Sequence, residues 1–129
     1  MNNKLYLLFN HTLTPEQVID ANDSFGITEF IVLPEALQAL WSNIPPDKGL
    51  NLVMHLKPIV DYFKKMKYMG YVLVQGDFGG VFYLVNQLQN MGYTPLYATT
   101  KRKVIEEKLP DNTIVSKRIF KHVCFRKYV

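Results

Sequence analysis

The sequence predicts an α/β protein with a mostly parallel sheet. Short strand-like runs alternate with helical patterns over residues 4–100, which is typical of a parallel sheet with helices between its strands. Two of the runs, FIVL at 30–33 and VLV at 72–74, are continuously apolar, as strands are when both faces of the sheet are covered. With 129 residues, 48% of them hydrophobic, we expect one domain over residues 1–129.

Strand propensity and bounding turn residues define the elements of the sheet. After residue 100 the helical patterns stop, and two strand-like runs flank the turn Pro110-Asp111-Asn112, so a C-terminal β-hairpin is expected. The parallel strands are expected at residues 4–10, 28–34, 71–75 and 94–100, and the hairpin strands at 103–109 and 113–128.

The first helix carries the clearest boundary signals. Thr14 is a typical N-cap, Pro15 suits the first helical position, and Gln17 completes a capping box, while Gly26 is expected to end the helix. Pro58 is expected to kink or split the third helix, because proline removes a backbone donor. The other helices are expected at residues 34–44, 50–66 and 79–91.

Charge is unevenly distributed along the chain. Residues 1–100 hold six lysines and eight acids, a net charge of −2, whereas residues 101–129 hold nine basic residues and three acids, a net charge of +6. A basic end suggests an anionic partner such as a nucleotide or RNA, although charged strands also protect a sheet edge from aggregation.

Several protein classes are disfavoured by the composition. No apolar run reaches the roughly 18 residues of a membrane span, and the start of the chain has no small-residue cleavage pattern, so we expect a cytoplasmic protein. The single Cys124 cannot form an internal disulfide. Three scattered histidines and few converging carboxylates argue against a zinc or two-metal site, and we expect neither metal nor cofactor.

In open parallel sheets, ligands bind beyond the carboxyl ends of the strands. After the first strand, Asn10-His11-Thr12 offers an imidazole that can donate to a phosphate or transfer a proton; alternatively, Asn10 and Thr12 only organise the turn around an exposed His11. After the second, Trp41 can stack on a base, but its helical spacing favours a place in the core.

The third strand is followed by Gln75-Gly76-Asp77-Phe78-Gly79-Gly80. Free amides at the start of the next helix can hold an anion, but the glycine spacing matches neither of the two familiar phosphate-binding motifs. Asp77 would repel a phosphate unless it caps the helix, contacts a ribose hydroxyl or binds a metal; we favour the cap or the ribose contact.

The fourth strand leads into Thr99-Thr100-Lys101-Arg102-Lys103, where hydroxyls and cations suit phosphate oxygens, or serve only strand propensity and solubility. Strict alternation in the last strand places Phe120, His122, Cys124, Arg126 and Tyr128 on one face. His122 and Arg126 then lie at a subunit interface or reach a ligand.

Taken together, LFNHTLTPEQ, VLVQGDFG, YATTKR and F.H..FR.Y resemble a small family of ring nucleases associated with type III CRISPR systems. The resemblance covers about residues 5–128. It implies a Rossmann-like fold, a homodimer, and cyclic tetra-adenylate as the ligand, with no membrane or long nucleic acid as partner. It also implies metal-independent cleavage: a ribose 2′-hydroxyl attacks its own 3′-phosphate, which leaves a linear product with a 2′,3′-cyclic phosphate.

Transferred to this chain, the resemblance implies His11 as acid or orienting donor, Arg102 as charge stabiliser, and Asp77 as ribose contact or base. The hairpin would clamp the ring or build the dimer. Two other hypotheses about the function stay open. The protein could bind cyclic oligoadenylate without cutting it, or it could be an unrelated nucleotide-binding or protein-interaction domain. The implied ligand-binding residues are Asn10, Thr12, Gln75, Gly76, Phe78, Gly79, Thr99, Thr100 and Lys101.

Overall fold

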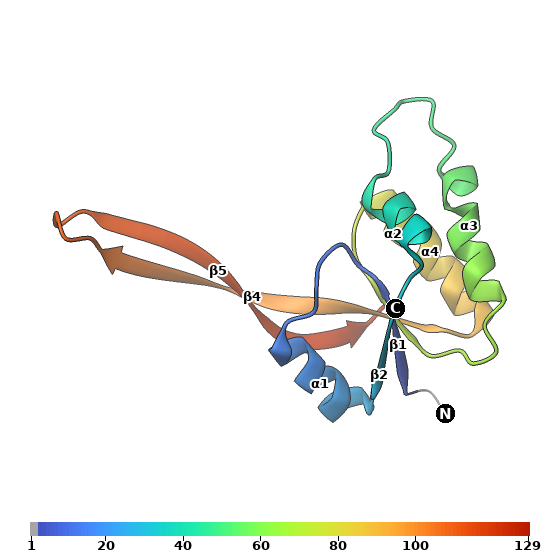
Figure 1. Ribbon diagram of the computed structural model, residues 1–129, viewed down its shortest axis with the longest axis horizontal. Helices are drawn as coiled ribbons and strands as arrows, with labels where there is room; N and C mark the ends of the chain where they lie inside the picture. Colours follow the sequence, from blue (N-terminus) through green and yellow to red (C-terminus); the bar gives the residue numbers. More distant parts are fainter. Residues whose placement is uncertain (1–2) are drawn as a thin grey trace.

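A computed structural model describes residues 3–129 and confirms the α/β class. One five-stranded sheet has the strand order β2-β1-β3-β4-β5, in which only the β4–β5 pair is antiparallel (Figure 1). The fold is therefore Rossmann-like with a C-terminal hairpin. Its elements are β1 (Lys4–Leu8), α1 (Pro15–Phe25), β2 (Glu29–Val32), α2 (Glu35–Ser42), α3 (Leu52–Lys64), β3 (Tyr71–Val74), α4 (Phe78–Met91), β4 (Thr94–Lys108) and β5 (Ile114–Lys127).

The two faces of the sheet are covered unequally. Tyr6, Leu8 and Val72 pack with α2, α3 and α4 in the larger core, whereas Leu5 and Leu73 point to the opposite face and pack with α1. This alternation follows from the two-residue repeat of a strand. A single helix on the second face leaves part of it open, and the apolar groove beside His11 described below lies on that side.

The boundary signals of the first helix are confirmed. The Thr14 hydroxyl accepts a hydrogen bond from the Gln17 amide, the Gln17 side chain accepts one from the Thr14 amide, and Gly26 ends the helix in a left-handed conformation. The expectation that Pro58 splits the third helix is wrong, because α3 runs without a break from Leu52 to Lys64. Burial of four α3 side chains in the core, including Leu56 and Ile59, offsets the lost backbone hydrogen bond.

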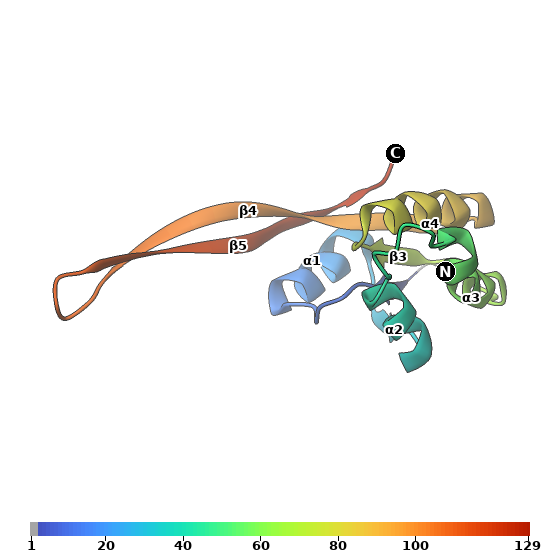
Figure 2. The same ribbon diagram turned by 90° about the horizontal axis from the view of Figure 1, so that it is seen from above.

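The fourth strand is longer than the sequence predicts. We expected it to end at residue 100 and to be followed by a separate hairpin, but β4 continues to Lys108 and is itself the first arm of that hairpin. Beyond Leu96, which pairs with Leu73, the strand has no parallel neighbour and is held only by β5. The two strands therefore project as a twisted ribbon far from the helices (Figures 1 and 2).

A β-bulge corrects the predicted faces of the last strand. Thr99 pairs with Cys124, whereas the next residue, Thr100, pairs with His122, so Val123 is an extra residue in β5. Such an insertion reverses the alternation beyond it. His122 therefore lies beside Phe125, with 4.7 Å between the ring centroids, instead of sharing the face of Cys124.

Trp41 belongs to the core, as its spacing favours. The ring is 1% exposed, and its Nε1 donates to the Gln75 carbonyl at 3.0 Å. Gly76 has φ +156°, and a Cβ there would lie 3.0 Å from Trp41 Nε1, while a Cβ at Gly80 would lie 3.1 Å from the same ring. These glycines thus allow the backbone to approach the indole closely.

No helix within residues 3–129 combines the length and the apolar character that a membrane crossing requires.

We expect Gly76→Ala to lower the free energy of unfolding by about 1–3 kcal/mol, because the new methyl group meets Trp41 and the positive φ is strained. Gly49→Ala is the matched control, since a Cβ at Gly49 meets nothing within 4 Å, and its effect should stay within about 0.5 kcal/mol. Urea unfolding followed by tryptophan fluorescence measures both variants. Equal stability of the two variants would contradict the close contact between Gly76 and Trp41.

Candidate functional site

The base of the hairpin is attached to the body of the protein by Asp20 of α1. Asp20 Oδ2 accepts two hydrogen bonds from β5, one from His122 Nε2 at 2.8 Å and one from the Phe125 amide at 3.1 Å. Ser24 Oγ donates to Oδ1 at 2.7 Å. The two donors from β5 lie on either side of the bulged Val123, so the bulge presents both to one carboxylate.

These hydrogen bonds determine the charge state of Asp20. Its side chain is 18% exposed, and burial by itself disfavours the ionised form. The hydrogen bonds from Ser24, His122 and the Phe125 amide outweigh burial and hold the pKa of Asp20 below its ordinary value, and a protonated His122 adds its positive charge to this effect. Asp20 is therefore a carboxylate at neutral pH, and His122 must carry its proton on Nε2.

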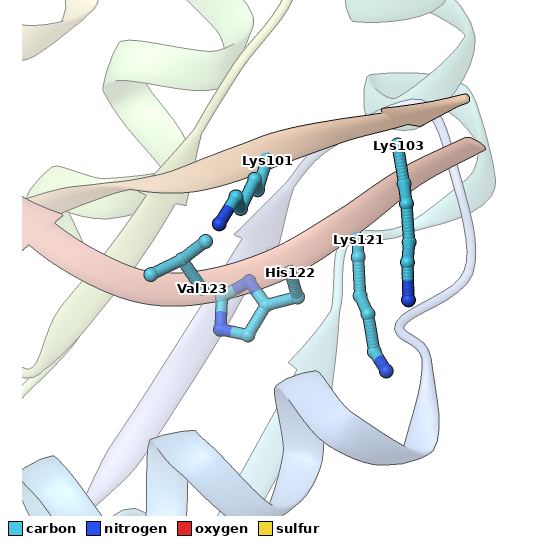
Figure 3. Close-up of a pocket in the computed structure, with 5 residues that line it drawn as sticks. All are labelled: Lys101, Lys103, Lys121, His122 and Val123. Atoms are coloured by element: carbon cyan, nitrogen blue, oxygen red, sulfur yellow. The ribbon is translucent and has the colours of Figure 1, made fainter. Parts of the chain in front are cut away.

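His122 lines a cavity of about 420 Å³ together with Lys101, Lys103, Lys121 and Val123. Its side chain is 5% exposed, and Nδ1 is buried without a hydrogen-bond partner among residues 3–129. Figure 3 shows Lys103 and Lys121 extending in the same direction from the two strands, with the imidazole beside them under β5. We call these four residues, Lys101, Lys103, Lys121 and His122, the hairpin-base cluster.

The hairpin-base cluster continues into a second groove that reaches the start of α1. Thr14 and Gln17 line that groove together with Thr100, Lys103 and His122. Because Thr100 lies beyond the carboxyl end of β3, the groove stands at the edge of the sheet where ligands of open α/β proteins bind.

His11 lies on the opposite side of the α1 N-terminus. With Asn10 and Thr12 it lines a cavity of about 730 Å³, which is also lined by Leu13, just before α1, and by Val18 in the first turn of that helix. His11 is exposed, and its ring packs edge-on against Phe9 at 5.4 Å between centroids. The apolar side chains of the uncovered sheet face complete the walls: Leu7, Phe30 and Val32. The first-loop residues therefore border an apolar groove.

In the turn after β3, a side chain of the turn itself fills the place that the sequence suggests for an anion. Asp77 caps α4, and its Oδ2 accepts a hydrogen bond from the Gly80 amide at 2.9 Å. Of the two roles that the sequence favours for Asp77, the helix cap is therefore the one present in the structure. A carboxylate at this position neutralises the helix end that an anion would use. A glycine is needed at position 76 because a Cβ there would meet the Trp41 ring, and a Cβ at Gly79 would lie 3.4 Å from Leu52.

Other predicted ligand-binding side chains also have partners within the protein. Gln75 Oε1 accepts from the Ala98 amide at 2.8 Å. The Thr99 hydroxyl donates to the Cys124 carbonyl at 2.9 Å and accepts from the Cys124 amide at 3.2 Å, so it stabilises the bulge. Arg102 lies in the projecting ribbon, where its guanidinium stands 5.5 Å from the Phe120 ring centroid. Phe78, in contrast, is 94% exposed.

The predicted site residues fall into separate places. Asn10, His11 and Thr12 share the apolar groove, while Thr100 and Lys101 border the hairpin-base cavities on the other side of the α1 N-terminus. Gln75, Gly76 and Phe78 line a different cavity with Tyr97 and Tyr128, whose ring packs in the α4-side core. The three loops thus share an edge of the sheet, but they do not form one pocket.

Sequence reasoning missed Asp20 and Lys121 as site residues and left His122 between two roles. Asp20 is a polar residue inside an amphipathic helix, and its two partners in β5 are 102 and 105 positions away. The basic composition of the last segment was the available signal for Lys121. Within residues 3–129, no three His, Cys, Asp and Glu side chains gather in a group able to hold a metal ion.

A family model and a related protein both match almost the whole chain, and both point to the same family. The family model described as "Uncharacterized protein MJ1673 family" matches residues 3–126. The chain is 45% identical to "Uncharacterized protein MJ1673" of Methanocaldococcus jannaschii over 126 residues, which cover 97% of this chain and 96% of that protein. No solved structure matches the chain.

We expect Asp20→Asn to lower the free energy of unfolding at pH 7 by about 1–3 kcal/mol, because it weakens hydrogen bonds to a charged acceptor. The folded-state pKa of Asp20 lies below its unfolded value, so its contribution is present above about pH 4 and is lost as the pH falls through the folded value. The difference between wild type and variant should therefore shrink on acidification. Denaturant unfolding at a series of pH values measures it.

Asp23→Asn is the control for that series, because Asp23 is exposed on the same helix and the substitution removes the same charge. Its effect should stay within about 0.5 kcal/mol at every pH. A loss for Asp20→Asn no larger than that for Asp23→Asn would show that Asp20 does not hold the hairpin.

Proposed function

The chain belongs to the MJ1673 family, and we propose that it is a ring nuclease: it binds cyclic tetra-adenylate and cleaves it without a metal. The observation that carries the proposal is the hairpin-base cluster, where three lysines and a histidine surround one cavity at the carboxyl edge of the sheet. The residues that resemble ring nucleases, including NHTLTPEQ and ATTKR, lead into that edge from two strands. Cleavage would end type III CRISPR signalling by this messenger.

The three lysines of the hairpin-base cluster supply positive charge and hydrogen-bond donors for a phosphate. Lys101 and Lys103 come from β4 and Lys121 from β5, so three ammonium groups border a cavity of about 420 Å³. All three are exposed, so each charge stays hydrated in the free protein at little cost. Phosphates entering this cavity gain charge-assisted hydrogen bonds, and the lysines stabilise the negative charge that develops during attack.

The apolar groove beside His11 suits an adenine base. Its walls are apolar side chains such as Leu7 and Phe30, and its rim carries the amides of Asn10 and Gln38. Gln38 Nε2 already donates to the Phe9 carbonyl and Asn10 Oδ1 already accepts from Ser42, which leaves Gln38 Oε1 to accept from adenine and Asn10 Nδ2 to donate to it. The apolar walls contact the faces of the base. Because this groove and the hairpin-base cavities flank the α1 N-terminus, one ring can place a base in the first and a phosphate in the second.

Our proposal keeps the roles implied by the family resemblance for three side chains. His11 is exposed at the rim of the apolar groove, where it donates to the ligand or orients it. Arg102 leaves its contact with Phe120 to neutralise charge on the ring. Asp77 leaves its helix cap on the Gly80 amide to contact a ribose.

A homodimer completes the proposal. Cyclic tetra-adenylate is compatible with two-fold symmetry, and an isologous dimer offers the same side chains to each half of the ring. The projecting ribbon of β4 and β5 exposes apolar side chains, among them Ile114 and Phe120, each 62% exposed. Because an isolated two-stranded ribbon is only marginally stable in water, we expect a second copy to cover part of it.

Binding without cleavage is the second candidate. It is favoured by the partners of two side chains expected to act in catalysis: Asp77 caps α4, and Arg102 stacks on Phe120. Such a protein would lower the free concentration of the messenger and release the ring intact.

Incubation of the purified protein with radiolabelled cyclic tetra-adenylate in EDTA distinguishes these candidates. We expect linear product carrying a 2′,3′-cyclic phosphate, in excess over the protein. Recovery of an intact, protein-bound ring would support sequestration instead. Absence of binding in calorimetry, with rings of four and six nucleotides both tested, would contradict both and leave an unrelated binding domain.

We expect Arg102→Ala to weaken binding and cleavage of cyclic tetra-adenylate together, by roughly 10- to 100-fold each, because it removes one charge-assisted contact worth about 1.5–3 kcal/mol. Arg118→Ala is the matched control, since Arg118 is exposed in the other strand of the same ribbon. Calorimetry and single-turnover cleavage measure both variants. Wild-type behaviour of Arg102→Ala would remove Arg102 from the site.

A further inference from the structure

The two ring nitrogens of His122 have different surroundings, which suggests a role for this side chain beyond binding a phosphate. One ring nitrogen, Nε2, donates to the Asp20 carboxylate at 2.8 Å, and the other, Nδ1, is buried without a partner among residues 3–129. A buried acceptor that lacks a hydrogen bond costs about 1–3 kcal/mol, so Nδ1 needs a donor from outside residues 3–129: a water in the free protein, which a ligand hydroxyl can replace. His122 is one of the residues that line the cavity bordered by Lys101, Lys103 and Lys121, and Figure 3 shows its ring against β5 beside Lys121.

The tautomer restricts what this partner can be. Because Nε2 carries the proton that Asp20 accepts, neutral His122 presents a lone pair at Nδ1 and needs a donor such as a hydroxyl. The neighbouring lysines need an anion. A ribose 2′-hydroxyl beside its own 3′-phosphate offers these two groups on adjacent atoms.

We propose that His122 is the general base of the reaction, with Nδ1 accepting the proton of the attacking 2′-hydroxyl and Asp20 orienting the ring. This inference rests on the proposed function and names the base for it. It assigns to His122 the proton transfer that the resemblance left to Asp77, whose carboxylate is bonded to its own helix.

The step is balanced without an oxidant, a metal or a second substrate. The 2′-hydroxyl proton moves to Nδ1, and the bond from O2′ to phosphorus forms as the bond from phosphorus to O5′ breaks. The electron pair of the broken bond goes to O5′, which takes a proton from water. The resulting imidazolium is stabilised by Asp20 and returns its proton to solvent, as the histidine of a buried carboxylate–histidine pair does.

His122→Gln tests the role with little change of shape. The glutamine amide can take the place of Nε2 as donor to Asp20, but it offers no basic nitrogen at the position of Nδ1. We expect the single-turnover rate with cyclic tetra-adenylate to fall by about 10²–10⁴-fold, the usual contribution of a general base, while the dissociation constant changes by less than about threefold.

His55→Gln is the matched control. His55 is another partly buried histidine with a hydrogen bond through Nε2, to the Leu40 carbonyl at 2.9 Å, and it lies in α3 among the helices of the opposite face. Its rate should equal that of wild type. Thermal unfolding of both variants shows that they are folded at the assay temperature.

The outcomes separate this inference from the proposed function. If the wild-type protein cleaves the ring and His122→Gln cleaves it at the same rate, the inference is wrong and the function stands. If the wild-type protein neither binds nor cleaves the ring, the function fails and the inference with it.

A measurement on the wild-type protein covers the case in which His122→Gln does not fold. With ¹⁵N-histidine label, the His122 Nδ1 resonance should move on addition of phosphorothioate cyclic tetra-adenylate, which keeps its 2′-hydroxyls. It should move less with the 2′-deoxy ring. Equal movement with both rings, or none with either, would overturn the contact between Nδ1 and the hydroxyl.

Discussion

The carboxylate of Asp20 is the contact on which the arrangement of the site depends. It joins α1, near the amino end of the chain, to β5, at the carboxyl end, through His122 Nε2 and the Phe125 amide. Beyond the parallel part of the sheet, the ribbon of β4 and β5 has few other attachments to the body. Because both donors flank the bulge at Val123, this acceptor stabilises the bulge together with the Thr99 hydroxyl, and it determines the tautomer of neutral His122.

The architecture was predictable because its signals are local. The capping box of Thr14 and Gln17 and the terminal glycine Gly26 define the ends of the first helix within a few residues of chain. The continuous apolar run VLV at 72–74 identifies the buried strand β3. The similar run FIVL at 30–33 is wrong as a sign of burial on both faces, because β2 is an edge strand in which Val32 is 70% exposed. The length of β4 was not predictable in this way, since residues 101–108 look like a separate strand until their pairing with 114–121 is known. The split of the third helix expected at Pro58 does not occur, because core packing of α3 outweighs the missing backbone donor.

The site was less predictable because its contacts are distant in sequence. Asp20 and His122 are 102 residues apart, and only a bulge, which shifts the face of one strand by one residue, brings His122 and Phe125 to the same carboxylate. The glycines of QGDFGG suggested a phosphate cradle, yet Gly76 and Gly80 face Trp41, and Asp77 occupies the helix end. The basic composition after residue 100 was the sequence signal that led to the lysines of the hairpin base.

The central claim is that the phosphates of a cyclic oligoadenylate lie at the hairpin base. A crystal structure of the wild-type protein with a 2′-deoxy cyclic tetra-adenylate, which cannot be cleaved by 2′-hydroxyl attack, tests it most directly. We predict a phosphate within hydrogen-bond distance of at least two of Lys101, Lys103 and Lys121. A ring bound with its phosphates at the turn around Asp77, and none at these lysines, would contradict the account.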